Sequence, residues 1–138
     1  MIKYCDNSSY GADGFTDNLT VLEQMDDAAY QSDNTCRMPT YDEFKELLDY
    51  TDGRFEMLND TYNGIRLTSN INGNSIFIPP CGHIFNGLLK EEKYVKLWSN
   101  TIDSDNHGSC KCLLQYGSML DIFWLSRCIG LPIRAVKL

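Results

Sequence analysis

Cysteine and histidine are the side chains of this sequence best suited to chemistry, as nucleophiles, bases or metal ligands. The chain has two histidines, His83 and His107, and six cysteines: Cys5, Cys36, Cys81, Cys110, Cys112 and Cys128. Cys112 with His107 or His83 could supply a thiolate nucleophile and a base. Six cysteines and two histidines form such pairs by chance, and the sequence has no GxSxG, P-loop or HExxH motif. We therefore predict a protein that is not an enzyme and has no catalytic residues.

The spacing of these residues does not match that of metal sites. No CxxC occurs, and the closest pair is the CxC of Cys110 and Cys112, whereas structural zinc sites need four well-spaced ligands. The segment 103–108 places oxygen-bearing side chains at alternate positions, as calcium loops do, but it lacks a closing glutamate. We predict neither metal nor cofactor and interpret 103–108 as a polar loop. Whether the cysteines are free or disulfide-bonded stays open.

The stretch from 107 to 131 carries apolar residues at consecutive positions instead of alternate ones. These residues are Cys110, Cys112, Leu113, Leu114, Tyr116, Leu120, Ile122, Phe123, Trp124, Leu125, Ile129 and Leu131. Consecutive side chains of a strand point to opposite faces, so a strand with one covered face cannot bury them all. Either both faces of these strands are covered, or some of the side chains face solvent as a binding surface.

Helical periodicity is confined to the first third of the chain. Residues 20–31 repeat apolar side chains at helical spacing. In residues 39–50, Thr40 is a predicted N-cap, and Glu43 is its capping-box partner three residues later. The sequence therefore predicts one helix in each segment.

After residue 53 the pattern changes to short strands. The segments 65–68 and 75–79 form a predicted hairpin around Asn72 and Gly73. Further extended segments are expected at 95–102, 110–116, 120–125 and 132–138. This order predicts an α+β fold in which two helices flank short antiparallel sheets. The residues expected in the core or at the helix cap are Thr40, Phe44, Leu47, Leu48, Ile76, Ile78, Trp98, Ile133 and Val136.

Length and charge limit the kind of protein further. The chain has 138 residues, of which 43% are hydrophobic, enough to bury one core, so residues 1–138 are predicted to form a single domain. The net charge is −7; residues 1–88 carry 14 acids against 5 bases, and residues 89–138 carry 5 acids against 7 bases. Neither part contains the basic stripe typical of nucleic-acid binding. Nucleic acid is therefore not an expected partner.

The apolar segments are too short to cross a bilayer. The longest, around residues 75–80, spans a fraction of the roughly 20 residues that a membrane helix needs. The first ten residues lack the apolar stretch of a signal peptide. We expect a soluble domain without membrane insertion, and the sequence does not assign a location.

Five short motifs occur in an order that is known from one group of domains. They are DDAA at 26–29, CRMPTYDEF at 36–44, SIFIPPCGH at 75–83, LWSNT at 97–101 and RCIGLPIRAV at 127–136. In this order they resemble the C-type lectin-like domains of the formylglycine-generating-enzyme type, especially the bacterial "major paralogous" surface domains. The resemblance covers about residues 19–138. The chain lacks the Arg-Gly-Gly and tryptophan-rich segments of the enzymes, and the Glu-Pro-Asn and Trp-Asn-Asp motifs of calcium-dependent lectins.

The resemblance implies a binding module. Part of this lineage consists of the variable proteins of diversity-generating retroelements, whose C-terminal stretch is hypervariable; here that region corresponds to about residues 98–131. The ligand is expected to be a protein or another macromolecule, with display on a cell or virion surface as a typical setting. The side chains predicted to vary and to project toward the ligand are Asp103, Asp105, His107, Ser109, Cys112, Leu114, Tyr116, Phe123, Leu125, Cys128, Ile129 and Leu131.

Residue types within this region are compatible with adenine mutagenesis. Cys112, Leu114, Phe123 and Ile129 stand where relatives usually have polar or aromatic residues, and AAY codons mutated at adenine can encode all four types. Such codons cannot encode Lys, Gln, Glu, Met or Trp. Five residues of 98–131 belong to that excluded group, namely Trp98, Lys111, Gln115, Met119 and Trp124. Ordinary composition would give nearly as few, so the count alone does not discriminate.

Two other functions remain alternatives at this stage. A Cys-dependent enzyme of the formylglycine-generating type would use Cys110 and Cys112, and would need a thiolate beside an open cleft. An invariant structural surface or pilus-associated domain would have no hypervariable positions and would expose polar residues in place of the predicted contacts.

Overall fold

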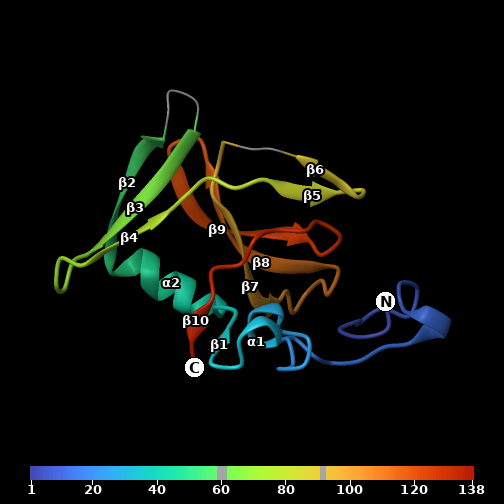
Figure 1. The fold of residues 1–138 in the computed structure, drawn as a ribbon. Coiled ribbons are helices and arrows are strands. Elements are labelled where there is room, and N and C mark those ends of the chain that lie inside the picture. Colours follow the sequence, from blue (N-terminus) through green and yellow to red (C-terminus); the bar gives the residue numbers. More distant parts are fainter. Residues whose placement is uncertain (59–61, 91–92) are drawn as a thin grey trace.

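The protein is built mainly from short antiparallel strands (Figure 1). The computed structural model describes residues 1–58, 62–90 and 93–138. Strands account for 40% of the chain and helices for 13%. The predicted α+β class is therefore wrong, and the fold is mostly β. One part of the difference is the first predicted helix, most of which is not helical.

That first helix, expected over 20–31, is reduced to α1, Ala28–Ser32. It begins at Asp27, whose carboxylate accepts hydrogen bonds from the N–H groups of Ala29 and Tyr30. Residues before this cap pair with a strand instead: Leu22 N–H donates to Asn100 O, and Ile102 N–H donates to Thr20 O. The prediction failed because this pairing with distant residues outweighs a weak helical pattern.

The second predicted helix is confirmed as α2, Tyr41–Asp49, with the predicted capping box. Thr40 Oγ1 accepts from the N–H of Glu43, and the Glu43 carboxylate accepts from the N–H of Thr40. Arg37 donates two hydrogen bonds of 2.7 Å to the same carboxylate. These bonds lower the pKa of Glu43 to about 2, with Arg37 as the main cause. A short 3-10 turn, Ala12–Gly14, lies near the N-terminus.

The strands form four small antiparallel sheets. The first pairs β1, Cys36–Arg37, with β10, Val136–Lys137. The second has the order β2, Thr51–Leu58, then β3, Tyr62–Ser69, then β4, Ser75–Ile78. The third is the hairpin of β5, His83–Phe85, and β6, Leu88–Lys90. The fourth has the order β7, Lys96–Ile102, then β8, Ser109–Tyr116, then β9, Met119–Ser126.

Most of the predicted strands are present. The hairpin expected from 65–68 and 75–79 is confirmed by the pairing of β3 with β4, in which Thr68 lies opposite Ser75. The segments 95–102, 110–116 and 120–125 correspond to β7, β8 and β9. Of 132–138, only Val136–Lys137 is a strand.

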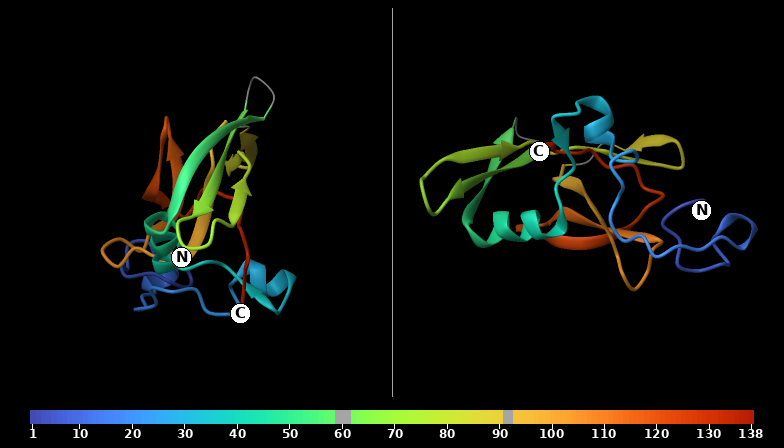
Figure 2. Two further views of the ribbon diagram at one scale, coloured as in Figure 1. Left: turned by 90° about the vertical axis from the view of Figure 1, so that its left-hand side faces the viewer. Right: turned by 90° about the horizontal axis from the view of Figure 1, so that it is seen from below.

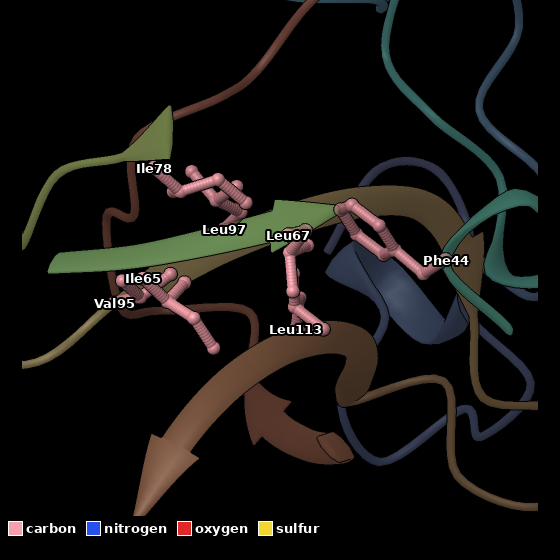
Figure 3. Packing of buried hydrophobic residues seen from close by; sticks show 7 residues of the cluster. All are labelled: Phe44, Ile65, Leu67, Ile78, Val95, Leu97 and Leu113. Carbon is pink, nitrogen blue, oxygen red and sulfur yellow. The ribbon is translucent and has the colours of Figure 1, made fainter. Parts of the chain in front are cut away.

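The main core lies between α2, the β2–β4 sheet and the β7–β9 sheet. Its buried members, shown in Figure 3, are Phe44, Ile65, Leu67, Ile78, Val95, Leu97 and Leu113. Leu47 and Leu48 pack against this cluster as predicted. Ile76 was also predicted in the core, but it does not belong to this cluster. It lies in the edge strand β4, close to the turn that joins β3 to β4, and is 38% exposed. Trp98, Ile133 and Val136 are half-buried.

A second, smaller core joins the N-terminal segment to the β7–β9 sheet. Tyr4, Ile102 and Cys110 are buried together, and Leu19, Leu22 and Trp98 pack against them. The N-terminal segment lies at the opposite end of the molecule from the β2–β4 sheet (Figures 1 and 2). The β7–β9 sheet therefore takes part in both cores. Within the described residues no helix has the length and apolarity needed to span a membrane.

Candidate functional site

The β8–β9 hairpin contains the apolar stretch that the sequence singles out. Each residue from Ser109 to Tyr116 pairs with one from Ser126 to Met119, without a bulge. Gly117 opens the two-residue turn with φ +60°, in the left-handed region that favours glycine. Regular pairing divides the side chains between two faces. The inner face consists of Ser109, Lys111, Leu113, Gln115, Leu120, Ile122, Trp124 and Ser126; the outer face consists of Cys110, Cys112, Leu114, Tyr116, Met119, Asp121, Phe123 and Leu125.

The inner face is tied to the main core. Leu113 is fully buried, and Leu120 and Ile122 pack against the same cluster. The buried side-chain amide of Gln115 accepts from Val95 N–H and donates to Gly117 O, both at 3.2 Å. These contacts fix the hairpin against α2 and β7.

The outer face brings together five of the predicted contact residues: Cys112, Leu114, Tyr116, Phe123 and Leu125. Tyr116 is 75% exposed, and Leu114, Phe123 and Leu125 are half-buried. Two further residues, Met119 and Asp121, are exposed on this face. Four of the five predicted residues therefore reach solvent on one face, beside two that sequence reasoning did not select.

Cys112 does not reach solvent, so the expectation that its side chain projects is wrong. It is 0% exposed and lies opposite Trp98 of β7. The Trp98 indole N–H donates to Ile129 O, and the Trp98 backbone N–H donates to Pro132 O. These two bonds hold the segment after β9 against β7. The outer face is thus closed near Cys112 and open near Tyr116.

The other predicted contact residues lie away from this open end. They lie in the loop before β8, at Ser109, the first residue of β8, and in the segment after β9, at the end of the hairpin opposite its turn. His107 and Leu131 are buried, which rules out direct contact with a ligand in this conformation. Asp103, Ser109 and Ile129 are half-buried, whereas Asp105 and Cys128 are exposed.

The loop at 103–108 is stabilised by local hydrogen bonds. The N–H of Asp105 donates to the Asp103 carboxylate, and the N–H of Gly108 donates to the Asn106 side chain. Arg127 also donates to His107 O at 2.9 Å. Among the described residues, no group of three His, Cys, Asp or Glu side chains is placed to hold a metal ion.

Burial keeps the two thiols of the CxC pair protonated. It raises the pKa of Cys110 to about 11 and that of Cys112 to about 12. All six cysteines are free, and Cys128 is the exposed one. A thiolate nucleophile at 110 or 112 would need the opposite shift.

We expect Cys128 to react first when the folded protein is treated briefly with iodoacetamide near pH 8. Cys110 and Cys112 should remain unlabelled because both burial and their raised pKa values protect them, and they should react once the protein is unfolded in urea. Peptide mapping by mass spectrometry after timed labelling measures this order. Labelling of Cys112 as fast as Cys128 in the folded state would contradict it.

Sequence reasoning missed a cleft between α2 and β9. The Lys111 ammonium lies 4.5 Å from the ring centroid of Tyr41 and 4.7 Å from that of Trp124. Both rings line the cleft with Lys45 of α2, and Trp124 is 55% exposed. Tyr41 and Lys111 are distant in sequence, so no local pattern indicates their contact.

Four of the five sequence motifs meet in one hydrogen-bonded unit. Within it, Met38 N–H donates to the Asp27 carboxylate, Tyr41 N–H donates to Thr101 Oγ1, and Trp98 N–H donates to Pro132 O. Comparison of the chain with protein-family models, curated proteins and solved structures finds no match. The resemblance to C-type lectin-like domains therefore rests on the motifs and stays a prediction.

Proposed function

We propose that this protein is a non-enzymatic binding module that presents the outer face of β8–β9 to a protein or another macromolecular ligand. The observation that carries the proposal is the placement of four predicted contact residues, Leu114, Tyr116, Phe123 and Leu125, on one solvent-reaching face. The inner face of the same strands is fixed in the core. Such an arrangement allows side chains to change while the backbone stays in place.

The chemistry of this face suits a largely apolar contact. Tyr116 and Phe123 offer large rings with few rotatable bonds, which is how binding surfaces gain energy at low entropic cost. Asp121 is the one charged residue of the outer face. The ligand surface that it fits is therefore largely apolar.

The residue types that mutated AAY codons cannot encode lie mostly on the inner face of the hairpin. Three types that mutated AAY codons cannot encode, at Lys111, Gln115 and Trp124, lie on the inner face, and one, at Met119, lies on the outer face. The remaining outer residues are all of encodable types. This division supports our proposal that the chain is a variable protein of a diversity-generating retroelement, displayed on a cell or virion surface.

A genomic observation tests the retroelement assignment. The source genome should contain a reverse transcriptase gene nearby and a near-duplicate of the coding sequence for 98–131. The two copies should differ at adenines of the duplicate, in codons for outer-face residues such as Tyr116 and Phe123. If neither gene nor duplicate lies nearby, the retroelement assignment fails, while a binding role for the outer face remains open to the next test.

The binding face is tested by comparing two libraries on the same strands. One library randomises Leu114, Tyr116, Asp121, Phe123 and Leu125 of the outer face. The control library randomises four buried or half-buried inner residues: Leu113, Gln115, Leu120 and Ile122. We expect most members of the first to fold and most of the second to fail, because an interior packed at crystal-like density does not accept exchange.

Surface display with a protease challenge measures the folded fraction of each library, and selection against a purified protein such as lysozyme measures binding. Binders should arise from the outer library alone. Equal survival of both libraries, or loss of folding in the outer library, would show that the outer face is structural and would favour an invariant structural domain.

A further inference from the structure

We infer that the cleft between α2 and β9 is a binding site for a small monocarboxylate with an apolar body. The cleft has a volume of 290 Å³, close to the lower limit of common small-molecule sites. Its walls come from Tyr41, Lys45 and Leu48 of α2 and from Lys111, Ile122 and Trp124 of β8 and β9. It opens beside the inner face and shares only Asp121 with the binding face proposed above.

The centre of the cleft presents one ammonium among apolar groups. Lys111 is half-buried and contacts the rings of Tyr41 and Trp124. Within the described part of the chain, its Nζ has no carboxylate or other hydrogen-bond acceptor within bonding distance. A partly desolvated ammonium gains most from an anionic acceptor, since charge-assisted hydrogen bonds are the stronger kind. A ligand carboxylate supplies that acceptor.

The apolar surroundings of Lys111 specify the rest of the ligand. Trp124 is 55% exposed although it lines the cleft, and Leu48 and Ile122 are half-buried beside it. An apolar body attached to the carboxylate would cover the indole and these two aliphatic side chains. Burial of such surface adds to affinity, and aromatic faces favour stacked rings.

Charges at the cleft limit the ligand to a single negative charge. Asp49 and Asp121 also line the cleft. The structure describes both aspartates and both cleft lysines, and neither aspartate forms an ion pair with Lys45 or Lys111. These carboxylates repel a second anionic group. The net charge of −7 also opposes the approach of polyanions such as nucleic acids.

The two tryptophans allow binding to be observed without a label. Trp124 lies at the cleft, whereas the Trp98 indole is bonded to Ile129 O elsewhere. Titration with phenylacetate, followed by the two indole N–H signals in a nitrogen–proton correlation spectrum, should shift the Trp124 signal saturably and leave that of Trp98 in place. Trp124→Phe assigns the signals. A dissociation constant on the order of 1 mM is expected for so small a ligand.

Two further probes separate the contributions of charge and ring. Phenylacetamide, with the same ring and no charge, should bind about tenfold more weakly, and acetate, with the charge and no ring, should not saturate. Lys111→Met should weaken phenylacetate binding by about tenfold, whereas Lys90→Met, on an exposed lysine outside the cleft, should leave it unchanged.

The inference is overturned if phenylacetate causes no saturable shift of the Trp124 signal, or if the amide binds as well as the acid. Equal binding by Lys111→Met and the unaltered protein would also overturn it. The comparison of acid with amide needs no substitution, so it holds even if Lys111→Met unfolds. None of these results bears on the two libraries, which test the outer face separately.

Discussion

Replacing Leu113 with alanine is expected to lower the free energy of unfolding by about 3–5 kcal/mol, whereas Leu114→Ala should lower it by about 1 kcal/mol. The two leucines are neighbours on β8 but point to opposite faces. Leu113 is 0% exposed within the main core, and Leu114 is half-buried on the outer face. The larger loss combines lost burial with a cavity that surrounding side chains cannot fill.

Urea unfolding followed by circular dichroism measures both losses, provided that the slope of the transition is the same for both variants. A domain of this size has a stability of about 5–15 kcal/mol, so Leu113→Ala removes a large part of it. Similar losses for the two variants would mean that the outer face is packed as tightly as the inner one. That result would remove the physical basis for a variable surface at Leu114.

Asp27→Ala is expected to destabilise the protein by about 2–4 kcal/mol. The buried Asp27 carboxylate accepts hydrogen bonds from Ala29, Tyr30 and Met38, all through backbone N–H groups. Alanine removes the N-cap of α1 and leaves the N–H of Met38 buried without its partner. The change therefore affects both a helix end and the link between α1 and β1.

The matched control for Asp27→Ala is Asp33→Ala. Asp33 is exposed, and its carboxylate accepts bonds from Thr35 only two residues away and a weak contact from the Cys36 thiol. We expect a loss of at most about 1 kcal/mol there, because water can replace these exposed bonds. Thermal unfolding followed by circular dichroism compares the two. A small loss for Asp27→Ala would show that α1 and the Met38 N–H are not held by this carboxylate.

Features that depend on neighbours in sequence were predictable. The capping box of Thr40 and Glu43 uses residues three positions apart, and the β3–β4 hairpin has its turn signal at Asn72 and Gly73. Both therefore appear in the sequence pattern and in the structure. Arg37, which strengthens the cap through Glu43, was not predicted, because no capping rule extends six residues upstream.

Features that depend on distant pairing were not predictable from the residues alone. Residues 20–22 have a helical pattern, yet they bond to Asn100 and Ile102 of β7. The candidate site shows the same limit. Strand alternation puts Leu114 and Tyr116, two residues apart, on one face, but the covering of Cys112 depends on Trp98 and on the segment after β9.

Arg127 links two parts of the chain that are synthesised far apart in time, because Tyr4 precedes it by 123 residues. Its guanidinium donates to Tyr4 O and to His107 O, so the N-terminal segment is held to the β7–β9 sheet by a residue close to the C-terminus. By contrast, α2 and the β2–β4 sheet pair segments within residues 41–78, which can meet early. On the ribosome the second half of the main core and the whole smaller core must therefore wait until the β7–β9 sheet has been made. Until then the N-terminal segment and the apolar face of β2–β4 stay exposed, which makes the nascent chain prone to aggregation at that stage.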